Sequence, residues 1–448
     1  MHSTQEKHRF KIVTALIETF GFSPWFASLV ALFLLLLAAA AVVWVWLSAP
    51  PRTLTIVSGP PGSSFQRYAE SYQKKLAEEG ITLKIVPTGG SLDNFMKLQD
   101  PDSGTDIGFV PGGLVTGEPP PALMSLGSVA YQPLWLFYRS PTKITRLSEL
   151  AGKRIGVGLP GSGTHALTST LLQMNGITGA PSTLVEQSSE TAANDLIAGK
   201  LDAVFLMGDS APTQTLRTLI RAPDIQLFHF AQADAYVRRL EYLNKIVVPQ
   251  GAIDFGLNLP AQDVVVIGPT VELVARKGLN SAISDMLLEK LKETHGNSSL
   301  LQRKAQFPAP ITTGFELSAD AGRYYKSGLG FTYRYVPSFW VASLVNRLLV
   351  AIVPIILIMI PLMRILPIAY RWSVQLRIYR CYRPLLRMER DTQGALTREQ
   401  ARALLERLDE IELDVNELKV PASFAYQFYA LRGHVAFVRS RLNHAAAA

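Results

Sequence analysis

The stretch VGLPGSGTHALTSTLLQMNGI, residues 157–177, joins a turn of small residues to the start of an amphipathic helix. Apolar side chains at Leu167, Leu171 and Met174 follow helical spacing and predict a buried helix face. The turn consists of glycines and hydroxyl residues, namely Gly158, Gly161, Ser162, Gly163 and Thr164. The first backbone N–H groups of a helix have no partner inside the helix, and the helix dipole is positive there. The turn therefore suits a bound anion, although Ser and Thr are also the ordinary residues that cap a helix.

The same order of strand, small-residue turn and helix recurs along the chain. TLTIVSG at 53–59 is followed by PPGSSF, and ITLKIV at 81–86 is followed by PTGGSLDNF. LDAVFLMGDSAP at 201–212 adds a further strand and turn. Strands that alternate with helices predict an α/β domain with a mostly parallel sheet, and ligands bind such sheets beyond the carboxyl ends of the strands. Several small-residue turns at that edge favour one convergent anion site over separate helix caps.

Two apolar stretches flank this region. Residues 26–47, FASLVALFLLLLAAAAVVWVWL, contain no charge and are long enough to cross a hydrocarbon core of roughly 30 Å. Residues 339–363 form the second stretch, in which Pro354 and Pro361 predict a kink. We interpret both as transmembrane helices. Arg347 interrupts the second one and is expected to extend toward the outer interface, with contact to a membrane partner as the alternative.

The basic residues around these stretches orient them. Lys7, Arg9 and Lys11 precede the first stretch, and residues 364–448, beyond the second, carry 14 basic and 9 acidic side chains. By the positive-inside rule, residues 1–25 and 364–448 are cytoplasmic, and residues 53–335 lie outside the cytoplasm. Most of the net charge of +8 therefore lies in segments that flank the membrane, and we expect no nucleic-acid surface.

The cytoplasmic tail, 364–448, carries two apolar heptad patterns and is predicted to form an α-helical hairpin. Their positions are Ala401, Leu404, Leu408, Ile411, Val415 and Leu418, and then Phe424, Phe428, Leu431, Val435, Val438 and Leu442. Both patterns are short, so an intramolecular antiparallel pair and self-association through the tail both fit them. Cys381 is the only cysteine, so the outer domain has no disulfide.

No motif in the outer region predicts a catalytic residue, a metal or a cofactor. Gly158 and Gly163 have the spacing of a phosphate-binding loop, but Thr164-His165 stands where Lys-Ser/Thr is required. Ser162 lacks Gly-x-Ser-x-Gly surroundings, and the histidines lack the spacing of zinc ligands. We therefore expect a binding protein rather than an enzyme.

The outer region resembles the TAXI-type solute-binding proteins of tripartite ATP-independent periplasmic (TRAP) transporters. The matching stretches are VPTGGSLDNFMKLQDPDSGTDIGFV, LSELAGKRIGVGLPGSGTHALTSTLLQMNGI, LIAGKLDAVFLMGDSAP and YLNKIVVPQGAI. They follow the family's order over roughly residues 53–300. The resemblance implies a two-lobed periplasmic-binding-protein (type II-like) fold over residues 53–335. One lobe would be about 53–137 and 250–330, the other about 138–249, with two crossover strands as the hinge.

The resemblance also implies that a small organic anion, an amino acid such as glutamate or another carboxylate, binds between the lobes. Carried over by position, its ligand shell comprises Ser63, Ser64, Phe65, Thr88, Gly90, Ser91, Asn94, Tyr131, Ser162, Gly163, Thr164 and Asp209. Tyr68 is the alternative to Phe65 as an aromatic wall. The implied partner is a TRAP membrane subunit, and the implied location is a bacterial inner membrane with the main domain in the periplasm. The usual family member is secreted or lipid-anchored. A ligand sensor that signals through its membrane helices and tail is therefore the alternative to transport.

Reporter fusions test this topology. A reporter that is active only outside the cytoplasm should be active when fused at Gly278 and inactive when fused at Ala448, because the positive-inside rule places the two positions on opposite sides. A reporter that is active only in the cytoplasm should show the reverse pattern. Cytoplasmic activity at Gly278 would contradict the membrane interpretation as a whole.

Overall fold

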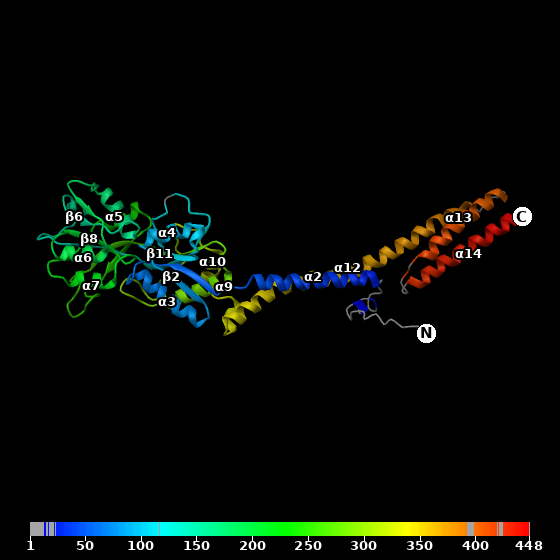
Figure 1. Ribbon diagram of the computed structural model, residues 1–448, viewed down its shortest axis with the longest axis horizontal. Helices are drawn as coiled ribbons and strands as arrows, with labels where there is room; N and C mark the ends of the chain where they lie inside the picture. Colours follow the sequence, from blue (N-terminus) through cyan, green and yellow to red (C-terminus); the bar gives the residue numbers. More distant parts are fainter. Residues whose placement is uncertain are drawn as a thin grey trace. The chain divides into compact units, whose positions relative to one another are not determined.

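The computed structural model describes residues 24–115, 117–391, 398–418, 420 and 424–447, together with residues 13, 14, 17 and 22. The chain divides into one compact unit of Ala49–Val345 and another formed by Met1–Ser48 with Asn346–Ala448 (Figure 1). Most of the segment 1–25 that we expect in the cytoplasm lies outside the described residues.

The Ala49–Val345 unit contains two lobes, and the first is a sheet in the order β2-β1-β3-β11 with β4 also paired to β11. Its strands are β1 (Thr53–Val57), β2 (Thr82–Val86), β3 (Ile107–Pro111), β4 (Leu123–Tyr131) and the second half of β11 (Val264–Arg276). Its helices are α3 (Ser64–Glu78), α4 (Ser91–Gln99), α9 (Ser281–His295), α10 (Ala319–Ser327) and α11 (Phe331–Tyr335), with a 3-10 turn at Pro101–Ser103. Tyr72 and Leu76 on one face of α3 pack with Leu54 and Ile56 of β1, as their spacing predicts.

The second lobe continues the sheet in the order β11-β5-β8-β6-β7. Its strands are β5 (Leu134–Tyr138), β6 (Arg154–Gly156), β7 (Thr183–Val185), β8 (Ala203–Met207), β9 (Gln226–Leu227), β10 (Leu243–Val248) and the first half of β11. Its helices are α5 (Gly163–Met174), α6 (Ser189–Ile197), α7 (Thr213–Arg221) and α8 (Ala233–Arg239), with a 3-10 turn at Leu147–Leu150. Leu167 and Leu171 of α5 are buried as predicted, but Met174 at the helix end is 36% exposed, and Leu172 is buried instead.

Two segments cross between the lobes, and they correct two expectations. β11 pairs with β10 of the second lobe and then with β3 and β4 of the first, and Gln132-Pro133 links β4 to β5. The chain therefore leaves the first lobe near 132 rather than 137, and returns within β11 rather than near 250. The sheet is also not mostly parallel. β1–β2, β1–β3, β6–β7 and β6–β8 are parallel, whereas every described pair formed by β11 or β5 is antiparallel, because the crossover strands run against their neighbours.

In the part of the chain that the structure describes, two helices are long and apolar enough to cross a bilayer: α2 (Pro24–Leu47) and α12 (Phe339–Asp391). Arg347 of α12 donates from Nη1 to the carbonyl oxygen of Val45 in α2 at 2.6 Å. The rings of Phe26 and Tyr370 stack near the opposite end of α2, with centroids 5.1 Å apart. These two contacts hold α2 and α12 antiparallel. The guanidinium of Arg347 thus binds a carbonyl group of the neighbouring helix.

The second half of α12 belongs to a bundle rather than to an extended tail. α12 continues helical past 363 to Asp391, with Pro354, Pro361, Pro367 and Pro384 inside it. It packs against α13 (Arg398–Glu417) and α14 (Ala425–Ala447). The buried residues of α12 in this contact are Val374, Ile378, Leu385 and Met388. They meet the predicted heptad residues of α13 and α14, namely Leu408, Ile411, Val415, Leu431, Val435, Val438 and Leu442. The predicted hairpin therefore exists, and α12 adds a third helix to it. Burial raises the pKa of the Cys381 thiol on this helix, which favours the unreactive protonated form.

A buried histidine makes the stability of the first lobe depend on pH. His295 at the end of α9 is 3% exposed and contacts the Tyr72 hydroxyl at 2.6 Å. Burial, with a smaller contribution from Lys75, lowers the pKa of His295 from 6.5 to about 3. Between these two pH values the unfolded chain binds a proton that the folded lobe excludes, so stability falls as the pH falls from about 6.5 toward 3.

We expect the His295→Gln substitution to remove this pH dependence of stability, because an amide can still hydrogen-bond to Tyr72 but does not titrate. As the pH falls through this window, the wild type should lose about 1.4 kcal/mol more free energy of unfolding per pH unit than the variant loses. Urea unfolding at pH 4.5, 5.5 and 6.5 measures the difference. His165→Gln, at a more exposed histidine, is the control and should follow the wild type. Equal slopes for wild type and His295→Gln would refute the assignment.

Candidate functional site

Helix N-termini from both lobes converge on Gly208-Asp209, directly after β8. Ser64 at the start of α3 donates from its N and Oγ to the carbonyl oxygen of Gly208, at 2.8 and 2.7 Å. Ser91 Oγ at the start of α4 donates to Asp209 Oδ2 at 2.8 Å. Gly163 N at the start of α5 donates to the same carboxylate oxygen at 2.6 Å. The strand–turn–helix units place these turns at one edge of the sheets, as their order in the chain predicts.

The Asp209 side chain is fully buried and surrounded by donors. Besides the two bonds above, Oδ2 lies 3.4 Å from Ser91 N, and Oδ1 accepts from Ser210 Oγ at 3.0 Å and from Thr164 Oγ1 at 3.3 Å. Burial raises the pKa of Asp209, and the hydrogen bonds from Ser91, Gly163 and Ser210 oppose that shift. The donors of the convergent turns therefore surround a carboxyl group, and that carboxyl belongs to the chain itself.

The opening turn both caps its helix and binds this carboxyl. Ser162 is the N-cap of α5, since its Oγ accepts from His165 N at 3.1 Å and donates to the Leu159 carbonyl at 2.6 Å. Gly163 and Thr164, the next two residues, provide the donors to Asp209. Ser63 likewise caps α3 by accepting from Gln66 N. Helix capping and binding of a carboxyl are therefore carried out by adjacent residues of the same turn, and neither excludes the other.

Glycine is required where the carboxyl approaches the backbone. A Cβ at Gly163 would lie 2.8 Å from both Asp209 Oδ2 and Ser91 Oγ, closer than real Cβ atoms come to their neighbours. Gly90 has φ +135°, and a Cβ there would lie 3.1 Å from Asp209 Oδ2. Both positions leave the helix N-terminus bare so that an oxygen reaches the N–H groups.

These contacts also join the two lobes. Ser64 and Ser91 lie in the first lobe, and Gly208 and Asp209 in the second. The backbone N–H groups of Leu92 and Asp93 donate to Gly161 O at 3.1 and 3.2 Å, again across the boundary. The lobes are therefore closed on each other at this edge.

Gln132, between β4 and β5 in the hinge, is a site residue that the sequence does not reveal. In the amide orientation that satisfies its bonds, its side-chain oxygen accepts from Gly208 N at 2.8 Å and from Asp209 N. It is buried, although no motif surrounds it. A polar residue between two apolar strands is the one signal that marks it.

Some of the remaining residues of the expected ligand shell support the turn before α4, and others lie in the hydrophobic core. Thr88 Oγ1 contacts the Asn94 side chain at 2.7 Å, and Asn94 donates to the carbonyl of Phe109, so both hold the turn before α4 in place. Phe65 is fully buried and stacks on Phe109, which leaves it no surface in the site. Tyr68, the alternative wall, packs against the same Phe109 ring. The Tyr131 hydroxyl accepts from Gln306 Nε2 at 3.0 Å.

A small cavity of about 180 Å³ lies beside the carboxyl, sharing Gly163 with it. Its walls are mainly apolar and come from both lobes: Leu92, Pro111, Gly112, Gly113, Leu114, Gly163, Ala166, Leu167, Thr170, Met207, Tyr242 and Pro269. Ligand pockets commonly measure roughly 300–1,000 Å³, so the closed cavity admits only a compact group. Sequence motifs pointed to the polar turns and did not identify these apolar wall residues.

The family model for the NMT1-like family matches residues 66–326, more than half of the chain. The chain belongs to the NMT1-like family. The matched segment includes α4, α5, β8 and the crossover strands, and thus nearly all of the site.

Solved structures similar to this NMT1-like chain are remote in sequence. An ancestral arginine-binding protein bound to arginine is 15% identical, with 55% of this chain and 92% of that chain covered at a TM-score of 0.34. The periplasmic aliphatic sulphonate binding protein SsuA from Escherichia coli is 13% identical, with 55% and 69% covered at a TM-score of 0.34. The regulatory domain of CcmR from Synechocystis PCC6803 in complex with 2-PG is 14% identical, with 55% and 98% covered at a TM-score of 0.37.

Ser162 and His165 of this NMT1-like chain do not pair as a nucleophile and its base. Ser162 Oγ is engaged in the cap, and His165 contacts Glu186 near the surface, Nε2 to Oε1 at 3.1 Å, rather than Ser162 Oγ. Within the part of the chain that the structure describes, no group of three or more His, Cys, Asp or Glu side chains is placed to hold a metal ion.

Removing the carboxyl should leave an anion site that a small carboxylate refills. Asp209→Ala leaves buried donors from Ser91, Gly163 and Ser210 without a partner, and each costs about 1–3 kcal/mol. We expect the melting temperature to fall by several degrees and to recover in part when acetate or formate is added at millimolar concentration. Methylammonium should not restore it.

Asp202→Ala is the control, since it removes a carboxyl that pairs with Arg154 at the surface of the same lobe. Acetate should not stabilise that variant beyond its effect on wild type. If acetate fails to stabilise Asp209→Ala, the donors do not form an accessible anion site.

Proposed function

We propose that residues 53–335 are an extracytoplasmic solute-binding domain for a small organic anion, tethered to the membrane and working in TRAP-type transport. The observation that carries this proposal is the carboxyl of Asp209 at the N-termini of α4 and α5. A donor set that accommodates one carboxylate at hydrogen-bond distance has the charge and geometry to accept another. An amino acid such as glutamate and other carboxylates belong to this class.

In this proposal Asp209 occupies the ligand's position in the unliganded, closed domain. An incoming carboxylate takes over the donors of Ser91, Gly163 and Thr164, and the Asp209 side chain turns away into solvent. The hinge at Gln132-Pro133 and within β11 lets the lobes part during the exchange. Ligand affinity is then reduced by the free energy with which Asp209 holds the same donors, because the two groups compete.

The cavity beside Gly163 determines what else the ligand carries. Its walls include Leu92, Leu114, Leu167 and Met207, and the described lining residues include neither Arg nor Lys. A second charged group would lose its hydration there without gaining a partner. Within the carboxylate class, the walls therefore favour a compact apolar remainder.

The tether is supported by the surfaces of α2 and α12. Leu35 and Leu36 of α2 and Leu357 and Ile358 of α12 are each at least 60% exposed, and a soluble protein would leave such a surface in contact with water. Lipid covers it if both helices span the membrane. The positive-inside rule then supports a domain outside the cytoplasm with both termini inside it.

Sensing is the second candidate function, and the continuity of α12 favours it. Phe339 at the start of α12 packs in the core of the first lobe, and Trp340 donates to the Glu79 carbonyl at 2.9 Å. The same helix continues to Asp391 and contributes Val374 and Met388 to the three-helix bundle. An unbroken helix from the ligand-binding unit to the tail could transmit closure, whereas a transport protein needs only an anchor.

Binding to the solubilised full-length protein tests the ligand class. We expect isovalerate and glutamate to stabilise the domain in thermal shift, and isovaleramide and isoamylamine not to do so. A carboxylate at about 100 times its Kd should add roughly 2.7 kcal/mol of stability. Isovalerate should bind more tightly than glutamate because of the apolar walls.

Three variants separate binding from folding. Ser91→Ala should weaken carboxylate binding about tenfold or more, since it removes a hydrogen bond to a charged group. Gly163→Val should abolish binding, because its side chain would occupy the position of the carboxylate oxygen. Leu171→Ala is the control: it should lower the melting temperature and leave calorimetric affinity unchanged. If only cations or neutral solutes bind, the anion proposal is wrong.

A further inference from the structure

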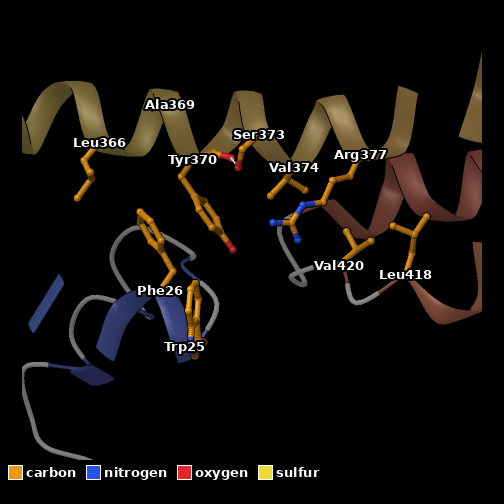
Figure 2. A pocket seen from close by; sticks show the side chains of 10 residues that line it. All are labelled: Trp25, Phe26, Leu366, Ala369, Tyr370, Ser373, Val374, Arg377, Leu418 and Val420. Atoms are coloured by element: carbon orange, nitrogen blue, oxygen red, sulfur yellow. Dashed lines mark hydrogen bonds between the residues drawn. The ribbon is translucent and has the colours of Figure 1, made fainter. Parts of the chain in front are cut away.

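A second pocket lies in the unit formed by Met1–Ser48 and Asn346–Ala448. It measures about 370 Å³. Its longest wall is one face of α12, formed by Leu366, Ala369, Tyr370, Ser373, Val374 and Arg377. Trp25 and Phe26 close it from α2, and Leu418 and Val420 close it from the end of α13 and the segment that follows (Figure 2).

The contacts between α2 and α12 place this pocket at the level of a membrane interface. At 1.5 Å per residue, the distance between the Arg347–Val45 hydrogen bond and the Phe26–Tyr370 stack is about 29 Å along α2 and about 35 Å along α12. These lengths match a hydrocarbon core of roughly 30 Å. Trp and Tyr side chains concentrate at such interfaces, and Trp25 and Tyr370 both line the pocket.

The lining combines apolar walls with one positive charge. Of the lining residues that the structure describes, Arg377 alone is charged. Figure 2 shows its guanidinium directed into the space beside the Tyr370 ring. Among the residues that the structure describes, no hydrogen bond or ion pair satisfies this guanidinium. Arg364 and Arg371 precede Arg377 in the same stretch of α12, Arg380 and Arg383 follow it, and all four add positive charge around it.

We propose that this pocket binds the phosphate headgroup of an anionic phospholipid, with Arg377 as the partner of the phosphate and the apolar wall against the glycerol and upper acyl chain. The proposal rests on the membrane-spanning part of the proposed function and not on the solute site. A guanidinium forms paired hydrogen bonds to a phosphate, and basic pockets between membrane helices on the cytoplasmic side suit lipid headgroups.

The walls favour a lipid over a free phosphate ion. A hydrated inorganic ion would meet one cation and lose water against Leu366, Val374, Leu418 and Val420 without compensation. A phospholipid brings apolar groups that cover those walls, and its acyl chains continue along the exposed apolar faces of α2 and α12. An anionic headgroup is favoured over phosphatidylcholine because choline places a second positive charge near Arg377.

The test is lipid binding to the solubilised full-length protein, measured by native mass spectrometry and by titration. The probes are phosphatidylglycerol, phosphatidylcholine, glycerol phosphate and inorganic phosphate. We expect phosphatidylglycerol to be retained in preference to phosphatidylcholine, and the two soluble phosphates to bind weakly. Arg377→Gln should reduce phosphatidylglycerol affinity about tenfold or more. Ala369→Trp, which fills the pocket without changing charge, should also reduce it.

Arg371→Gln is the matched control, because it removes the same charge from an exposed position on α12 that does not line the pocket. It should leave phosphatidylglycerol affinity nearly unchanged. Three results would overturn the proposal. An equal loss of affinity in Arg371→Gln and Arg377→Gln would show diffuse electrostatic attraction, and tight binding of free phosphate would show a soluble ligand. Unaltered phosphatidylglycerol binding in Arg377→Gln would show that this residue does not hold the headgroup. Circular dichroism verifies that each variant keeps its helices. Carboxylate affinity measured on the same Arg377→Gln sample should equal that of wild type, so a failure of the lipid pocket is distinguishable from a failure of the solute site.

Discussion

A carboxyl group buried at the N-termini of two helices is the constraint on which the Ala49–Val345 unit depends. An ionised carboxyl transferred out of water costs several kcal/mol unless donors surround it. Asp209 obtains its donors from α4 in one lobe and from α5 in the other, so it is satisfied only while the lobes are closed. The glycines at 90 and 163, the buried hydroxyls of Ser91 and Thr164, and the amide of Gln132 all serve this one group.

The same constraint connects structure to function. A binding protein works when its open and closed forms differ by little free energy and the ligand changes their ratio. Here the Asp209 side chain already occupies the donors, so in the proposed function a carboxylate ligand replaces that side chain rather than filling an empty site. The hinge is well suited to that exchange, because β11 is a single strand shared by both lobes while Gln132 fastens the second crossover to the Asp209 turn.

The other unit is arranged around a different requirement, the placement of polar groups next to apolar helices. Arg347 donates to a backbone carbonyl of α2, which gives its charge a partner at the end of the apolar segment. At the other end, Tyr370 and Phe26 stack, and α12 then exchanges its exposed apolar surface for a buried seam against α13 and α14. α12 is therefore apolar and largely exposed before Met363 and forms a bundle beyond it. In the proposed function lipid covers the exposed part, and Arg377 lines the pocket on the bundle side.

Local pattern was enough to predict the strand–turn–helix units, the two apolar helices and the heptad seams of the tail, because each depends on residues within a few positions of one another. Local pattern could not show which anion occupies the turns: Asp209 lies 46 residues from Gly163 and 118 from Ser91, and only the folded sheets bring them together. Strand direction, the crossover near 132, the burial of Phe65 and the third helix of the bundle were likewise decided by tertiary packing. The physical reason is the same in each case: periodicity records that a face is apolar or that a helix end lacks partners, whereas the identity of the partner depends on long-range contacts that no local spacing encodes.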